Sequence, residues 1–144
     1  MNKREKDRVE KAFNWVQRKL NTKFILLFEQ FIAQEDQDVS EDTHLCVERS
    51  LRKTEDPNYF IVYFDVKNTK PRSFKVLKQD ALHELTHIIN WMKRDIFEET
   101  LTYIKSGPLK KSLRNRFYEA DEASTYTLER AVGPFIIKGY KRDD

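Results

Sequence analysis

The chain of 144 residues is poor in cysteine, which cross-links a fold, and in glycine and proline, which mark turns and the ends of helices and strands. It has one cysteine, Cys46, so no disulfide bond can form within the chain, and a reducing, intracellular setting fits best. It has three glycines and four prolines, and the first glycine is Gly107, so turn signals are weak in the first half. No stretch approaches the roughly 18 apolar residues of a membrane span, and the N-terminus MNKREKDRVEKAF lacks an apolar signal-peptide segment. These absences predict a cytoplasmic protein with no membrane partner.

A strong excess of charge of either sign is also missing. The formal net charge is +3, which is too small to require a nucleic-acid partner. The distribution is uneven, because the runs Lys67–Lys78 and Tyr103–Tyr118 each hold five basic residues and no acidic one. Each run is interpreted either as a solvated face or as a basic rim that attracts an acidic protein or a nucleic acid.

Length and composition predict one folded domain over residues 1–144, since hydrophobic residues make up 39% and aromatic residues 12%. Residues 4–20 carry a helical stripe of apolar positions, namely Val9, Phe13, Val16 and Leu20. Strands are expected over residues 23–33, 44–51 and 59–66, of which YFIVYFDV at Tyr59–Val66 is the strongest. A loop is expected over residues 34–43 and a turn at residues 56–58.

The second half of the chain is expected to be helical. Helices are predicted over residues 74–92, 95–105 and 109–132, with Gly107-Pro108 and Gly133-Pro134 as the stop signals. Strands that are segregated from helices in this way indicate an α+β fold: an N-terminal helix, a small three-stranded sheet, and then helices.

Two histidines four residues apart stand in the run ALHELTHIINW of the predicted helix over residues 74–92. Because His83 and His87 share one helix face, both imidazoles can reach one metal ion. Glu84 stands beside such a metal and can take a proton from water, which is the HExxH arrangement of zinc metallopeptidases. The surrounding residues are uncharged, as a buried ligand helix requires: Ala81, Leu82, Leu85, Thr86 and Ile88.

A catalytic zinc ion needs one more protein ligand. The remaining histidine, His44, starts a predicted strand and is interpreted as an ordinary polar residue, and position 93 is Lys93 rather than a histidine. A carboxylate from the last helix is therefore expected, as in gluzincins. Glu122, with small and apolar neighbours, is preferred; Glu119 is the alternative, and Asp121 is a more distant one.

The stretch from about Tyr59 to Val132 resembles the small zincin-like metallopeptidases encoded by phages and prophages. HELTH followed by EADEASTYTLERAV, in the place of the late ligand helix, carries this resemblance. It implies a zincin-like fold, and host cytoplasm as the location if the chain is phage-encoded. It also implies that a peptide substrate binds in extended form along the free edge of the strand Tyr59–Val66.

The resemblance further implies a mechanism of peptide-bond hydrolysis. Zn²⁺ held by His83, His87 and Glu122 would activate water, and Glu84 would act as general base. Tyr118 and Tyr126 lie near the proposed ligand in the sequence, but no residue is assigned to the oxyanion. The alternatives are a non-catalytic zincin-fold module that binds a protein or nucleic acid through its basic runs, and a scaffold in which HELTH is accidental.

Overall fold

The computed structural model describes residues 2–33, 44–49 and 59–141, and it confirms the α+β class. The loop expected at residues 34–43 and the turn expected at residues 56–58 lie outside the described residues. The described elements are α1 (Lys3–Leu20), β1 (Ile25–Gln30), β2 (Leu45–Arg49), β3 (Tyr59–Phe64), α2 (Val66–Thr69), α3 (Phe74–Ile89), α4 (Trp91–Leu101) and α5 (Pro108–Ile136).

The three strands form one sheet in the order β1-β3-β2. β3 pairs with β1 in parallel and with β2 antiparallel, so it is the central strand. The prediction that the Tyr59–Val66 edge is free for a substrate is therefore wrong, because both edges of β3 are already hydrogen-bonded to neighbours. The strand also ends at Phe64, since the buried carboxylate of Asp65 caps the short helix α2 by accepting from the Lys67 amide at 2.9 Å.

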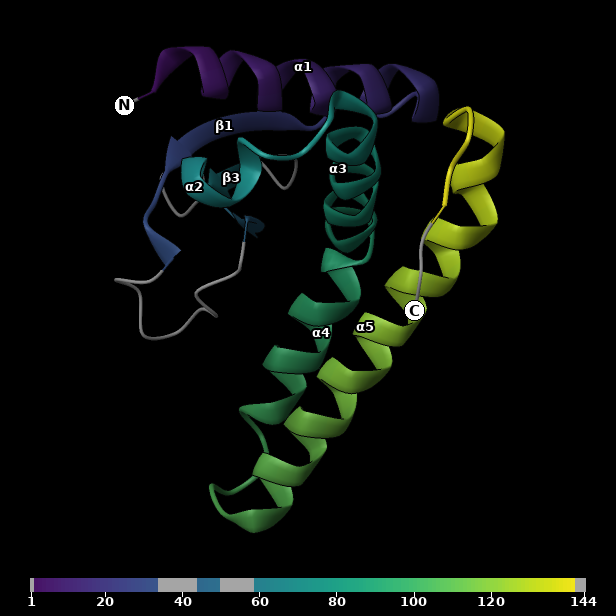
Figure 1. Ribbon diagram of the computed structural model, residues 1–144. Coiled ribbons are helices and arrows are strands. Elements are labelled where there is room, and N and C mark those ends of the chain that lie inside the picture. The colour runs from purple at the N-terminus through teal and green to yellow at the C-terminus, as the bar shows by residue number, and fades with distance from the viewer. Residues whose placement is uncertain (1, 34–43, 50–58, 142–144) are drawn as a thin grey trace.

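Helix α1 carries the apolar stripe that the sequence predicts. Val9, Phe13 and Val16 are fully buried, and Leu20 packs against the same core. Asn2 caps the start of α1 by accepting a hydrogen bond from the Glu5 amide. The stripe packs on α3 and on β1, so that α1 lies across the sheet and the upper end of α3 (Figure 1).

Several predicted helix boundaries differ from the structure, and the helix predicted over residues 95–105 is α4, which ends at Leu101. The helix with the HELTH motif ends at Ile89, and the next begins at Trp91, because the chain turns at the buried residue Asn90. Gly133-Pro134 does not end the last helix, so that prediction is wrong; α5 continues to Ile136. Gly133 stays helical because the ring of Tyr140 packs directly against it, in the space that a side chain would need.

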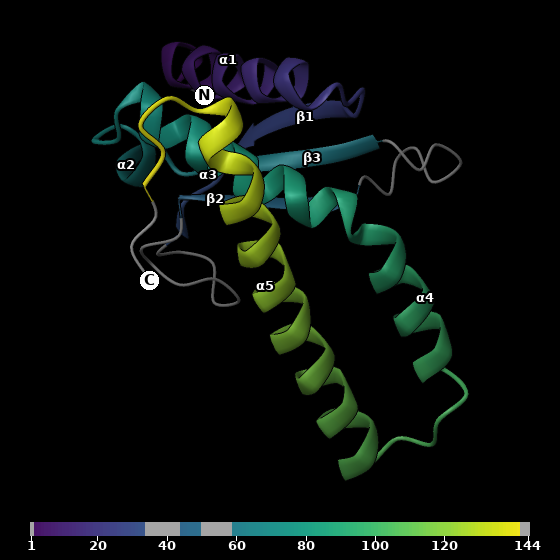
Figure 2. The ribbon, with the colours of Figure 1, turned by 90° about the vertical axis from the view of Figure 1, so that its right-hand side faces the viewer.

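The helices α4 and α5 form a hairpin that extends away from α1 and the sheet, and only the C-terminal part of α5 returns to the body (Figures 1 and 2). That returning part packs against α3. The following tail is tied to the same helix, because the Gln79 amide donates to the Lys141 carbonyl at 2.7 Å. In the part of the chain that the structure describes, no helix combines the length and apolar character needed to cross a membrane.

Candidate metal centre

The helix α3 holds the two motif histidines on its inner face. Ser73 starts the helix, because its hydroxyl accepts a hydrogen bond from the Val76 amide at 3.2 Å. The expected uncharged neighbours of the motif are all buried, which confirms the prediction that this helix is buried around the two histidines: Ala81, Leu82, Leu85, Thr86 and Ile88. The four-residue spacing brings the two Nε2 atoms of His83 and His87 to 3.2 Å from each other.

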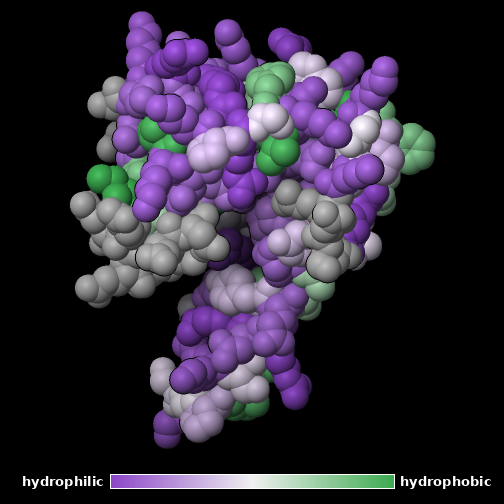
Figure 3. All heavy atoms as spheres, in the orientation of Figure 1, coloured by the Kyte–Doolittle hydropathy of each residue, from purple (hydrophilic) through white to green (hydrophobic). Residues whose placement is uncertain are grey.

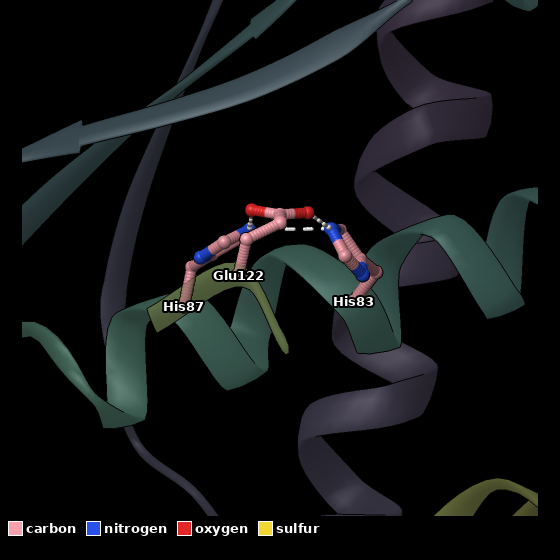
Figure 4. Close-up of side chains that lie close together, drawn as sticks. All are labelled: His83, His87 and Glu122. Carbon is pink, nitrogen blue, oxygen red and sulfur yellow. Dashed lines mark hydrogen bonds and ion pairs between the residues drawn. The ribbon is translucent and has the colours of Figure 1, made fainter. Parts of the chain in front are cut away.

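The helix α5 places the carboxylate of Glu122 against both imidazoles (Figure 4). Its Oε1 atom lies 3.2 Å from Nε2 of His83, and its Oε2 atom lies 3.2 Å from Nε2 of His87. Glu122 meets these residues, which lie 39 and 35 positions earlier in the chain, because α5 packs along α3. Of the two glutamates proposed from the sequence, the structure brings Glu122 to the histidines; Glu119 is exposed and is not part of this group.

The donor atoms of this group fit a zinc ion. Zinc binds imidazole nitrogen at about 2.0–2.1 Å and carboxylate oxygen at about 2.0–2.2 Å in tetrahedral geometry, so its ligand atoms are spaced about 3.3 Å apart. The Nε2 atoms of His83 and His87 are 3.2 Å apart, and each lies 3.2 Å from a different oxygen of Glu122, so that one donor atom from each residue lies within 4.8 Å of the others. Three such ligands leave the fourth position of a tetrahedron open, which is the pattern of catalytic zinc sites.

A second carboxylate from α5 orients His83. Glu129 is fully buried, and its Oε2 atom lies 2.9 Å from Nδ1 of His83. Because a carboxylate accepts the hydrogen bond, the Nδ1 atom of His83 carries the proton and its Nε2 atom faces Glu122. Sequence reasoning missed this residue, although Glu129 follows Glu122 by seven positions, which is two helical turns and the same face of α5.

The other ring has its own polar partners on α5. The hydroxyl of the buried residue Thr125 lies 3.3 Å from Nδ1 of His87, and Oδ2 of Asp121 lies 3.8 Å from the same atom. Asp121, the most distant of the three ligand candidates, thus lies on the far side of the His87 ring from Glu122. Both imidazoles therefore point their Nε2 atoms toward Glu122 and their Nδ1 atoms toward other polar groups of α5.

The pKa values in the site follow from this crowding of opposite charges. Burial alone would lower the pKa of His83, but hydrogen bonds from its ring to Glu122 and Glu129 outweigh burial and raise the pKa to about 9. The same hydrogen bonds, to His83 and His87, hold the pKa of Glu122 far below its usual range. These shifts favour a protonated His83 beside an ionised Glu122 in the metal-free protein.

Glu84 is the carboxylate of the motif and is not one of the three residues of this group. It is half-buried, and the desolvation of its carboxyl raises its pKa, against the opposing effect of His87, His83 and His44. A carboxyl whose pKa is raised toward neutrality is suited to exchange protons with a reacting group.

His44 lies closer to the motif than the sequence indicated. Its Nε2 atom is 3.1 Å from Oδ2 of the buried residue Asp80, one helical turn before Glu84. Arg72 binds the same oxygen at 3.0 Å. His44 is also one of the charges that oppose the rise in the pKa of Glu84.

The two tyrosines near the ligand helix occupy different places. The ring of Tyr126 packs on the imidazole of His83, with centroids 4.6 Å apart. The hydroxyl of Tyr118 donates to Glu98 within the α4–α5 hairpin. Tyr126 is thus a neighbour of the group of His83, His87 and Glu122, whereas Tyr118 belongs to the hairpin.

Comparisons of the chain with protein-family models, with curated proteins and with solved structures found no match.

Proposed function

We propose that this protein is a zinc-dependent metallopeptidase with a zincin-like arrangement of its site. The observation that carries this proposal is the group of His83, His87 and Glu122. The two Nε2 atoms are 3.2 Å apart, each lies 3.2 Å from one of the two oxygens of the Glu122 carboxylate, and Glu84 follows His83 directly on the same helix. An accidental HExxH sequence gives no reason for a downstream glutamate to meet both rings, or for a buried glutamate to orient one of them.

Each residue has a distinct role in this proposal. His83, His87 and Glu122 hold the ion, and Glu129 and Thr125 fix the orientation of the two rings. Bound zinc supplies a Lewis acid and lowers the pKa of water to about 7. Glu84 accepts the proton of the attacking water and delivers it to the leaving amine, for which its raised pKa suits it.

The edge of β2 replaces the edge of β3 as the place for a peptide substrate. Among the described residues, β2 pairs with β3 only, so its outer edge carries backbone groups that no other strand binds. The strand packs against α3, and His44, just before Leu45, lies beside the first turns of the motif. An extended peptide that adds to this edge would run past Glu84 with its backbone held in one register.

The test is cleavage of a proteome-derived peptide pool by zinc-loaded protein, read by mass spectrometry. We expect cleavage by the wild type and a loss of about 100-fold or more in Glu84→Gln, since general acid–base groups contribute this much. The matched control is Glu119→Gln, an exposed position one turn before Glu122, which should retain the wild-type rate. Zinc content is measured in all three proteins. Zinc-loaded wild type that cleaves nothing, or Glu84→Gln that cleaves at the wild-type rate, would overturn the proposal.

A further inference from the structure

Two basic segments that are distant in the sequence meet on one surface of the fold. The first is α1, and the second is the predicted basic run Lys67–Lys78, which contains α2 and the start of α3. Arg8 joins them, because its guanidinium donates to the carbonyls of Thr69 and Arg72 while it is paired with Glu5 at 2.9 Å. The joint surface of residues 3–19 and 67–78 is called the α1 basic face below.

The α1 basic face concentrates the charge of the whole chain. It carries twelve basic and three acidic side chains, a net charge of +9, whereas the chain as a whole carries +3. The remaining residues therefore carry −6. Hydrophilic side chains dominate the part of the molecule over α1 (Figure 3). A protein with this asymmetry presents one strongly positive face and repels anions elsewhere.

Two adjoining hollows run along this face. The larger, of about 570 Å³, is lined by Lys3, Arg4, Asp7, Arg8, Lys11 and Phe74. The second, of about 430 Å³, is lined by Asn2, Arg4, Glu5, Arg8 and Lys70. They share Arg4 and Arg8 and so lie next to each other between Lys11 and Lys70, and neither includes His83, His87 or Glu122.

An aromatic ring lines the larger of these two hollows. Phe74, the first residue of α3, is 39% exposed although it is a large apolar side chain. The Lys78 ammonium lies 5.4 Å from its ring and 4.2 Å from the ring of Trp15. A row of cations beside an exposed aromatic ring matches the two needs of a single-stranded nucleic acid, a path for phosphates and a surface on which a base can stack.

We propose that the α1 basic face binds single-stranded nucleic acid, with phosphates along Lys3, Arg4, Lys11 and Lys70 and a base on Phe74. This proposal is independent of the peptidase proposal, since it uses none of the site residues. The length of α1, about 27 Å for 18 residues, spans several nucleotides. An acidic peptide would pair with the same cations but has no base to stack on the Phe74 ring. A membrane surface would need several apolar side chains to insert, but Phe74 is the single apolar residue among those that line the two described hollows.

The second basic run supplies a matched control. Tyr103–Tyr118 also holds five basic residues, but the structure places it at the far end of the α4–α5 hairpin, away from α1 (Figures 1 and 2). Lys105, Lys111 and Arg116 are exposed there, as Lys3, Arg4 and Lys11 are exposed on the α1 basic face. Reversal of either set changes the net charge of the chain by the same amount, so any difference between them reports position rather than total charge.

The experiment is fluorescence anisotropy of a labelled 20-nucleotide single strand with the full chain at several salt concentrations. We expect affinity that falls with salt, and a loss of about tenfold or more in K3E/R4E/K11E, with little change in K105E/K111E/R116E. Phe74→Ala should weaken single-strand binding more than duplex binding. Phe135→Ala, which removes an exposed ring on α5, should change neither the single-strand affinity nor the duplex affinity.

Circular dichroism of each variant shows whether it is folded. The dependence of wild-type affinity on salt concentration is a test that needs no variant. Three outcomes would overturn the proposal: no salt-dependent binding by the wild type, equal losses in the two triple variants, or equally tight binding of polyglutamate or of anionic lipid vesicles.

Discussion

The Nδ1 atom of His83 lies 2.9 Å from Oε2 of Glu129, a carboxylate with no exposed surface. A buried carboxylate is costly unless it is paired, so this contact holds α5 and α3 together as well as orienting the ring. The same contact directs the Nε2 atom of His83 toward Glu122. Glu129 therefore links the packing of the two helices to the geometry of the proposed metal-binding group.

Replacement of this buried carboxylate tests its positioning role. We expect Glu129→Gln to lower zinc affinity by about 10- to 100-fold, the usual effect of removing a hydrogen-bond partner of a histidine ligand. Affinity is measured by competition with a chromogenic chelator. Glu119→Gln, on the same helix but exposed, serves as the control and should bind zinc as the wild type does. Equal zinc affinity in the wild type and Glu129→Gln would show that Glu129 contributes to helix packing but does not orient His83 for metal binding.

The choice between the two candidate third ligands has a direct test. Glu122 is the residue in contact with both Nε2 atoms, so Glu122→Ala should lose most of its zinc affinity while it keeps its fold. The 46% exposure of the Glu122 side chain means that its removal leaves no large cavity. If Glu119→Ala loses zinc and Glu122→Ala retains it in elemental analysis, the assignment of the third ligand is wrong.

Stability of the metal-free protein should depend on pH with a definite sign. The pKa of His83 is raised from 6.5 to about 9, so between these values the folded state holds a proton that the unfolded state releases. The stabilisation is complete below pH 6.5 and is lost as pH rises through 9, at about 1 kcal/mol per pH unit. Urea unfolding with a chelator present measures this slope, and His83→Gln should remove it.

Zinc should reverse this dependence. Neutral imidazoles bind the ion, so its binding competes with protons and strengthens as pH rises. Urea unfolding in the presence of zinc should therefore show stability that increases over the same pH range. A metal-free protein that gains stability from pH 6.5 to 9 would contradict the pKa shift of His83 and the contacts that cause it.

Because the end of α5 is closely packed, one methyl group added at Gly133 should lower the stability of the protein markedly. A Cβ atom at Gly133 would lie 2.6 Å from the Tyr140 ring, so Gly133→Ala should lower the free energy of unfolding by about 1–3 kcal/mol. In a Tyr140→Ala background the same substitution should cost little, because the clashing ring is gone. Thermal unfolding of the four proteins gives this comparison, and equal costs in both backgrounds would contradict the contact.

The sequence predicted the local features of the fold well. The helical stripe of α1 and the shared face of His83 and His87 depend on positions three or four residues apart, which the sequence displays directly. The preference for Glu122 over Glu119 came from the size and polarity of its helical neighbours. The first two features follow from short-range spacing alone, whereas the meeting of Glu122 with the histidines also needs the packing of α5 on α3.

The predictions that the structure corrects concern long-range packing. Strand order is not visible in a hydrophobic pattern, so β3 could be predicted as a strand but not as the central one, and β2 was not seen as the edge. Gly133-Pro134 is a common stop signal, but the contact of Gly133 with Tyr140 keeps the helix intact for another turn. The joining of α1 to the 67–78 run by Arg8 spans more than sixty residues and likewise has no local signature.

The central claim is that His83, His87 and Glu122 hold one zinc ion. The most direct measurement is anomalous diffraction at the zinc edge from crystals of the protein grown with zinc. The account predicts one strong peak at about 2.0–2.2 Å from the Nε2 atoms of both histidines and from a carboxylate oxygen of Glu122. No peak at this position, or a peak held by other residues of the chain, would contradict it.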